Sequence, residues 1–206
     1  MADRGWISLV WPVPSSKTIT QAFGAQFEVY QRKFGWLIGH SGMDIRTKTS
    51  IFPSGIGTPI VAAQGGEIVH AGDHPEKYGI TVVIKHPDNT CTLYGHCSET
   101  LVRVGNKVQA GQYIARSGNT GEFTTAPHLH FELWDLSLNG VKGVWGRIDP
   151  TPFMEDIRFT GGFGDRDIDG ETVFEDDIGP EGDLPIHEGH SLEDGDCGCG
   201  PFIPDF

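Results

Sequence analysis

The 206-residue sequence has no long apolar run and little basic charge, and each shortage excludes a class of protein. No apolar stretch approaches the roughly 18 residues that a membrane-spanning helix requires, so we expect no membrane span. Lysine and arginine number 15 against 28 acidic residues. With no basic patch for a phosphate backbone, nucleic acid is a poor candidate partner. The first residues lack a basic lead-in and Pro12 ends their apolar run, so we expect no signal peptide and synthesis in the cytoplasm.

Cysteine is also scarce, with four in the chain. Cys91 and Cys97 lie in one strand-like run, where six extended residues separate them by roughly 20 Å, too far for a disulfide. Cys197 and Cys199 are separated by a single glycine near the C-terminus. A cytosolic origin favours four reduced thiols. A metal clip at Cys197 and Cys199 is the alternative.

The negative charge is concentrated at one end of the chain. Residues 1–160 contain 14 acidic and 14 basic residues, whereas residues 161–206 contain 14 acidic residues and Arg166 alone. This last segment is rich in Gly, Asp, Glu and Pro and has few aliphatic side chains, so it cannot bury much surface. We predict an N-terminal segment, 1–34, that packs on a central domain, 35–155, followed by an acidic tail, 156–206, that serves for docking.

Glycine and proline are abundant, at 29 and 13 residues, and favour short strands joined by tight turns. Short β-branched or aromatic runs predict strands at 60–63, 67–71, 80–85, 90–94, 113–116 and 128–134, with a last strand or turn at 153–159. Residues 57–64 resemble residues 105–112, which indicates a fold of two related halves. We therefore predict an all-β fold, an antiparallel β-sandwich or barrel-sandwich of the duplicated hybrid type, with little helix.

Two histidines in an H-x-H pattern, His128 and His130, suggest a metal site. Residues i and i+2 of a strand face the same way, so both imidazoles project together while Leu129 and Phe131 enter the core. A catalytic zinc ion needs about three protein ligands and one open position. Further ligands are available from an H-x-x-x-D pattern.

That second pattern places His40 and Asp44 between glycines that let the backbone bend, and a Tyr-Gly-His run ends at His96. Together these segments resemble the lysostaphin-type (LytM-like, M23) zinc endopeptidases of bacterial cell walls. The resemblance covers about residues 35–150 and rests on Gly39-His40-x-x-x-Asp44, Gly57-Thr-Pro-Ile60-x-Ala62, Tyr94-Gly-His96, Gly105-x-x-Val108-x-x-Gly111-Gln112, Gly118-x-Thr120-Gly121 and His128-Leu-His130-Phe-Glu132.

The resemblance implies hydrolysis of the peptide cross-links of peptidoglycan by Zn²⁺ held on His40, Asp44 and His130. His96 and His128 would then flank the bound water and the scissile carbonyl. From the residues alone, His128 could equally be a fourth ligand that closes the site and leaves a structural zinc. Non-enzymatic members of the family lose ligands, and this chain keeps all five positions.

Other residues carry weaker signals. Asn119 and Tyr94 are candidate substrate contacts, and the aromatic residues between 20 and 38 either wall the groove or belong to the core. A D-x-D-x-D-G run at Asp165, Asp167 and Asp169 is a candidate Ca²⁺ loop, against which a solvated acidic run is the alternative. We expect surface positions for the remaining histidines, which are His70, His74, His86, His187 and His190.

The cellular context is predicted from the tail and the apparent lack of an export signal. A neutral body with an acidic Gly/Pro-rich tail favours a part docked into an assembly. Leaderless single-domain forms of the family resemble phage lysins. We therefore predict a component of a bacteriophage tail that binds other tail proteins through residues 156–206 and opens the wall during genome entry. The alternatives are a phage endolysin, a cellular wall-remodelling hydrolase, or a non-catalytic structural module.

Overall fold

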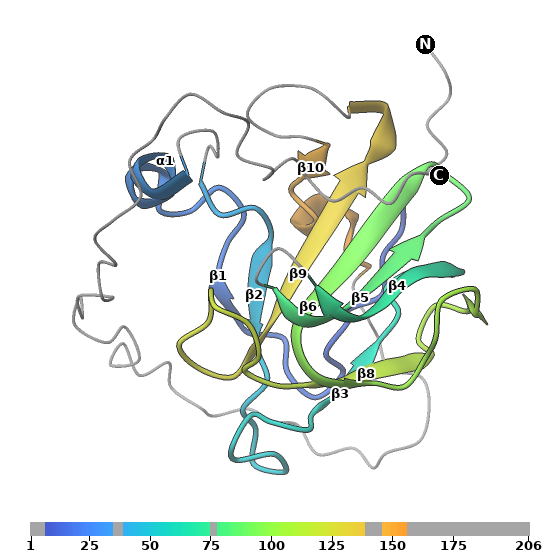
Figure 1. Cartoon of the computed structure of the whole chain (residues 1–206), viewed down its shortest axis with the longest axis horizontal. Coiled ribbons are helices and arrows are strands. Elements are labelled where there is room, and N and C mark those ends of the chain that lie inside the picture. The colour runs from blue at the N-terminus through green and yellow to red at the C-terminus, as the bar shows by residue number, and fades with distance from the viewer. Residues whose placement is uncertain (1–6, 35–38, 75–77, 139–145, 156–206) are drawn as a thin grey trace. The chain divides into compact units, whose positions relative to one another are not determined.

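The computed structural model describes residues 7–34, 39–74, 78–138 and 146–155, and within them strands dominate (Figure 1). These described residues contain one α-helix, α1 (Phe27–Phe34), and two 3₁₀ turns, η1 (Leu136–Leu138) and η2 (Thr151–Phe153). Ten strands lie in the described part of the chain: β1 (Ile19–Gln21), β2 (Met43–Arg46), β3 (Pro59–Val61), β4 (Gly66–His74), β5 (Gly79–Lys85), β6 (Thr90–Thr100), β7 (Lys107–Val108), β8 (Tyr113–Ser117), β9 (His128–Asp135) and β10 (Arg147–Ile148). The predicted all-β fold with little helix is confirmed.

All strand pairs are antiparallel, and the main path through the sheet runs β1-β2-β9-β6-β5-β4-β7. In addition, β10 pairs with β9, while β8 pairs with both β6 and β3. Strand β9 lies between β2 and β6 (Figure 1). The H-x-H pair is therefore on an interior strand, and the H-x-x-x-D pair leads into the strand beside it.

The two faces of β9 have different roles. Leu129, Phe131 and Leu133 are fully buried in the main hydrophobic core, together with Met43 and Ile45 of β2. The alternate residues of β9 face the other way, and they are His128, His130, Glu132 and Trp134. The predicted alternation is confirmed. Because adjacent side chains alternate across a strand, core packing on one face fixes the direction of the polar side chains on the other.

The internal sequence repeat corresponds to a reciprocal exchange of strands. The first copy contains β3, which pairs with β8 of the second half, and the second copy contains β7, which pairs with β4 of the first half. Each copy begins at a glycine with the same positive φ of 85°, Gly57 and Gly105. This left-handed conformation suits glycine because it has no Cβ. The exchange agrees with a fold built from two related halves.

Residues at both ends of the described chain contribute to the core. Leu9, Trp11 and Val13 are buried in it, and Leu9 forms an isolated bridge with Met154. The expected strand or turn at 153–159 is the short turn η2 and this bridge, and residues 156–159 lie outside the described residues. The sequence patterns did not predict β1, β2, β10 or α1, because these elements are short and carry no sustained apolar repeat.

Two further expectations concern cysteines and the membrane. Cys91 and Cys97 are buried free thiols, and burial raises the pKa of each to about 12, so both stay protonated. Cys197 and Cys199 lie outside the described residues. Among the helices that the structure describes, none has the length and apolar content needed to cross a bilayer.

Candidate metal centre

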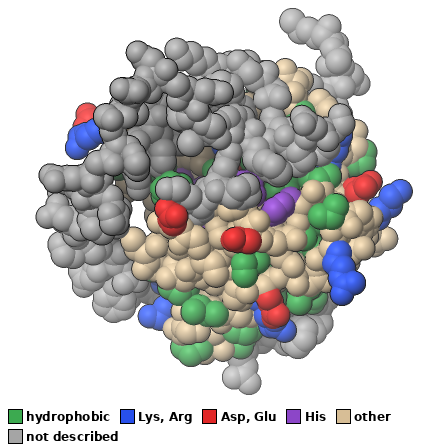
Figure 2. Space-filling model, in the orientation of Figure 1, with side chains coloured by type: hydrophobic (Ala, Val, Ile, Leu, Met, Phe, Trp, Pro, Cys, Tyr) green, Lys and Arg blue, Asp and Glu red, His purple; other side chains and the backbone are tan. Residues whose placement is uncertain are grey.

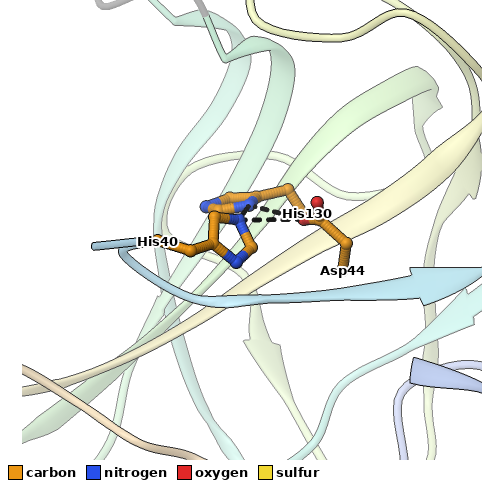
Figure 3. A group of neighbouring side chains, drawn as sticks. All are labelled: His40, Asp44 and His130. Carbon is orange, nitrogen blue, oxygen red and sulfur yellow. Dashed lines mark hydrogen bonds and ion pairs between the residues drawn. The ribbon is translucent and has the colours of Figure 1, made fainter. Parts of the chain in front are cut away.

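Three side chains predicted as metal ligands converge at one point (Figure 3). His40 Nε2 lies 3.1 Å from His130 Nδ1 and 3.2 Å from Asp44 Oδ1, and His130 Nδ1 lies 2.9 Å from the same oxygen. Asp44 and His130 are direct partners in the β2–β9 register. Zinc ligands about 2.0–2.1 Å from the ion stand roughly 3.3 Å apart in a tetrahedron, so the three atoms have nearly the required spacing.

Hydrogen bonds to groups outside the cluster determine which nitrogen of each imidazole faces the cluster. His40 Nδ1 donates to the Ala22 carbonyl at 3.2 Å, which leaves the lone pair on Nε2. His130 Nε2 donates to Glu132 Oε1 at 3.0 Å, so Nδ1 is the nitrogen that faces Asp44. Since a carbonyl or carboxylate only accepts, His40 Nδ1 and His130 Nε2 keep their protons, and a metal ion would bind at His40 Nε2 and His130 Nδ1. Two ring nitrogens and a carboxylate oxygen thus point at one another, and a cation could replace the protons between them.

The charges of the cluster also suit a cation. Burial opposes ionisation of Asp44, but hydrogen bonds from His128, His130 and His40 hold the pKa of its carboxyl well below the usual range. Burial alone would lower the pKa of His130, yet the hydrogen bonds to Asp44 and Glu132 outweigh it and raise the pKa to about 9. Lone pairs this close repel one another unless a proton or a metal ion lies between them. The donor set therefore fits Zn²⁺.

Close backbone packing brings His40 and Asp44 into place. Gly39 has φ of 110°, and a Cβ there would lie 2.3 Å from the Gly24 carbonyl oxygen. Gly42, between the two ligands, would place a Cβ 2.3 Å from the Phe131 carbonyl oxygen. A side chain at either position would overlap a backbone carbonyl of an adjacent segment, so these glycines allow the candidate ligands to lie close to β9.

His96 and His128 lie next to the cluster. Their ring centroids are 4.9 Å apart, and His96 is 5.8 Å from the ring of His130. His128 Nε2 is 3.5 Å from Asp44 Oδ1, a longer separation than those among the three central atoms. His128 is partly exposed, whereas His96 is buried. Histidine side chains are visible at the surface on the face shown in Figure 2.

A β-bulge and one threonine orient His96. The β5–β6 register shifts between Ile80 and Val82, and His96 takes a positive φ of 61°. Such a conformation is costly for a non-glycine residue and occurs often at functional sites. His96 Nδ1 donates to the Thr120 carbonyl at 2.8 Å, so its Nε2 keeps the lone pair. Burial, followed by the neighbouring His130 and His128, lowers the pKa of His96 to about 3, so the ring is neutral at physiological pH.

Sequence reasoning assigned no role to the partners behind His130. Glu132 is fully buried and contacts Tyr78, Trp134 and Arg147 in addition to His130. One signal was available, because Glu132 continues the alternation of His128 and His130 and must share their face. Tyr78 and Arg147 come from distant segments, and nothing in the sequence places them there.

Several weaker expectations are corrected. Tyr94 is fully buried, with its hydroxyl bonded to the Ala63 amide and to Thr92, so it cannot contact substrate from this position. His74 and His86 are buried instead of being at the surface. The candidate calcium ligands Asp165, Asp167 and Asp169, with His187 and His190, lie outside the described residues, and no other finding supports calcium.

Asn119 is exposed and accepts a hydrogen bond from Thr124. Among the aromatic residues between 20 and 38, Phe27 is 52% exposed, which does not agree with a place in the core. Tyr30 lies beside the proposed site, because its ring centroid is 5.7 Å from that of His40. Nothing is described for the side chains of Phe34 and Trp36.

Three bacterial proteins are similar to this chain in sequence. The chain is 44% identical to the peptidoglycan DD-endopeptidase ShyA of Vibrio cholerae over 46% of this chain and 20% of that one. It is 37% identical to a lipoprotein NlpD/LppB homolog of Pseudomonas aeruginosa over 60% and 35% of the chains. The murein hydrolase activator NlpD of Escherichia coli is 33% identical over 60% and 27%. The chain thus spans between 20% and 35% of the length of these relatives.

Solved structures agree with the sequence relationship. The antimicrobial peptidase lysostaphin of Staphylococcus simulans matches with a TM-score of 0.55 and 29% identity, covering 72% of this chain and 53% of that one. A zinc-containing peptidase from Vibrio cholerae matches with a TM-score of 0.52 and 29% identity, covering 69% and 39%. The resemblance noted in the sequence therefore extends to the fold.

The predicted location in a virion is wrong. The similar proteins are bacterial lipoproteins, hydrolase activators and a cell division protein, and none of those compared is described as a virion component. The prediction relied on the composition of the tail and of the first residues, and neither property identifies a compartment.

The family assignment is independent of that error. Residues 38–142, half of the chain, match the model of Peptidase family M23, and the chain belongs to this family.

Proposed function

We propose that this chain is a zinc-dependent endopeptidase that hydrolyses the peptide cross-links of bacterial peptidoglycan during remodelling of the cell wall. The main support is the convergence of His40 Nε2, Asp44 Oδ1 and His130 Nδ1 at separations of 2.9–3.2 Å. The similarity to a peptidoglycan DD-endopeptidase supports the substrate class. Three protein ligands leave one tetrahedral position for water, as in catalytic zinc sites.

When bound, zinc would supply a Lewis acid that polarises the scissile carbonyl and lowers the pKa of water toward about 7. We assign the proton transfers to His128, whose partly exposed ring lies beside Asp44. It takes a proton from the attacking water and returns it to the leaving amine. His96 remains neutral, and its Nε2 orients the water or the substrate amide. In this scheme His128 is a catalytic residue and not a fourth ligand.

A second candidate is a non-catalytic role as an activator of other hydrolases. The observation that favours it is the 33% identity to a protein described as a murein hydrolase activator. That role does not require a cluster of three candidate metal ligands or the two further histidines, His96 and His128, beside it. Because the chain has both features, we favour catalysis.

Digestion of purified peptidoglycan separates the two functions. The full chain loaded with zinc should release muropeptides with newly exposed amines, and mass spectrometry of these products would identify the bond that is cut. A zinc chelator should abolish the release, and added Zn²⁺ should restore it. If the zinc-loaded chain releases nothing from several peptidoglycan types but stimulates a second hydrolase, the activator role is correct.

A further inference from the structure

The strongest unassigned feature lies directly behind the candidate metal ligand His130. Glu132 is 0% exposed, and its two oxygens are surrounded by donors. Oε1 accepts from His130 Nε2 at 3.0 Å and from the Tyr78 hydroxyl at 2.9 Å. Oε2 accepts from Arg147 Nε at 2.9 Å and from the Trp134 indole. A buried carboxylate is costly unless it is paired, and here every contact stabilises its ionised form.

The surrounding residues hold the His130 ring in place as well as the carboxylate. Tyr78 stacks on His130 with a centroid separation of 5.4 Å and an interplanar angle of 27°. Arg147 also donates to the Tyr78 hydroxyl at 3.5 Å, and it comes from β10, which pairs with β9. The network therefore connects one candidate ligand on β9 to two other segments of the chain, at Tyr78 and at Arg147 on β10.

His130 differs in this respect from the other three histidines of the site. His40, His96 and His128 each donate from Nδ1 to a backbone carbonyl, those of Ala22, Thr120 and Ala126. For His130 the acceptor outside the cluster is instead a carboxylate, that of Glu132, which the Nε2 proton contacts. An anionic acceptor makes the opposite nitrogen a stronger electron donor than a neutral carbonyl does.

We propose that Glu132 is a positioning residue, which fixes His130 in the Nε2–H tautomer so that Nδ1 binds the metal ion. The inference rests on the proposed metal site and extends it to the residue that holds one of its ligands. Arg147 and Trp134 keep the Glu132 carboxylate ionised and immobile, while Tyr78 keeps the imidazole in the plane that directs Nδ1 to His40 and Asp44. Loss of the Glu132 charge would weaken metal binding without removing a ligand.

The first test measures zinc affinity in the full chain by competition with a chromophoric chelator. Glu132→Gln should bind Zn²⁺ about 10- to 100-fold more weakly than the wild type, the range found when such outer partners of ligands are removed. The matched control is Tyr94→Phe, which removes a fully buried hydroxyl on the core face of the same sheet. This control should lower the melting temperature but keep wild-type zinc affinity.

The outcomes distinguish this inference from the proposed function. If the wild type binds no zinc, the metal site itself fails. If the wild type binds zinc and a folded Glu132→Gln variant binds it equally well, Glu132 has no positioning role and only the inference fails.

A second measurement needs no change at Glu132 and decides the question even if that variant does not fold. Nitrogen-15 NMR of the zinc-loaded wild type, with the His130 signals identified by their loss in His130→Gln, reports the tautomer directly. We expect a proton on Nε2 and a metal-shifted Nδ1. The reverse assignment would overturn the proposal.

Discussion

Asp44 and His130 lie directly opposite each other on β2 and β9, with Oδ1 and Nδ1 2.9 Å apart, although 86 positions separate them in the sequence. The same register places Met43 against Phe131 and Ile45 against Leu129 on the buried face. A shift of one residue would turn the ligands into the core and the apolar side chains outward. Core packing therefore determines the geometry of the site and reduces the entropy lost when the ligands gather around an ion.

Asp44→Asn should abolish tight metal binding. The amide keeps the shape of the side chain but removes the negative charge that faces both His40 and His130. We expect zinc affinity to fall by at least about 100-fold and hydrolysis of peptidoglycan to disappear at limiting zinc. Asp88→Asn, in the turn between β5 and β6, is the matched control and should bind zinc normally. Unchanged affinity in Asp44→Asn would remove Asp44 from the ligand set.

Replacement of His128 by alanine should separate binding from chemistry. If His128 transfers protons, His128→Ala keeps the three ligands and its zinc content, while kcat falls by about 10²- to 10⁴-fold. Zinc content measured by atomic spectroscopy and kcat on a defined muropeptide test this together. His70→Ala is a suitable control, since His70 is a half-buried histidine on β4 outside the cluster. Zinc loss in His128→Ala would instead make His128 a fourth ligand.

Much of the fold and of the site was predictable from the sequence, for a local reason. The alternation of His128 to Trp134, the β-branched runs and the glycine punctuation are short-range signals that specify strands and the direction of their side chains. The repeat of residues 57–64 at 105–112 also predicted two related halves. The structure adds that these halves exchange strands β3 and β7. The candidate ligands followed from motif spacing combined with family resemblance.

The unpredicted parts depend on contacts between distant segments. Glu132 was visible as a motif position, but its role depends on Tyr78 and Arg147, which only the folded chain brings to it. His86 was expected at the surface, yet it is buried. Its Nδ1 contacts the Gly65 carbonyl and its Nε2 contacts the Thr92 hydroxyl, so both ring nitrogens have partners. Buried polar groups need such partners, and one sequence does not reveal them.

Thr120→Val tests the support of His96. The Thr120 hydroxyl donates to the Cys97 carbonyl at 2.7 Å and accepts from the Ile80 amide at 2.9 Å, which fixes the carbonyl that binds His96 Nδ1. Valine preserves the shape but loses both bonds, at a cost of about 1–3 kcal/mol in stability. We expect kcat to fall about tenfold with normal zinc affinity, measured below the melting temperature. A lower stability with unchanged kcat would show that His96 keeps its position without this threonine.

Gly42→Ala should damage the site through the backbone. The added Cβ would lie 2.3 Å from the Phe131 carbonyl oxygen, a rigid main-chain atom of the adjacent strand. Strands β2 and β9 must separate, so both stability and zinc affinity should fall. Gly111→Ala is the matched control, because a Cβ there meets no atom within 4 Å, although its positive φ still causes strain. That control should lose stability but retain zinc affinity, whereas equal losses of affinity would contradict the proposed steric cause.

The stability of the chelated, metal-free protein should depend on pH in two opposite ways. Burial, then the charge of His70, lowers the pKa of His74 to about 4, below the unfolded value of 6.5. Only the unfolded state binds this proton between the two values, so stability falls as the pH drops from about 6.5 to 4, with an upper limit of about 3 kcal/mol. His130 has the opposite sign. Its raised pKa gives a stabilisation that is complete below about pH 6.5 and is lost as the pH rises through about 9.

Urea unfolding at a series of pH values in the presence of a chelator measures both limbs. His74→Gln removes one titrating group and should flatten the acid limb between about pH 6.5 and 4, with the alkaline limb unchanged. The acid limb will not vanish, because the pKa of His96 is also lowered, to about 3. His130→Gln should remove the alkaline limb instead. If His74→Gln leaves the acid limb at its full slope, His74 is already able to take up its proton in the folded protein, and burial at this position does not limit stability.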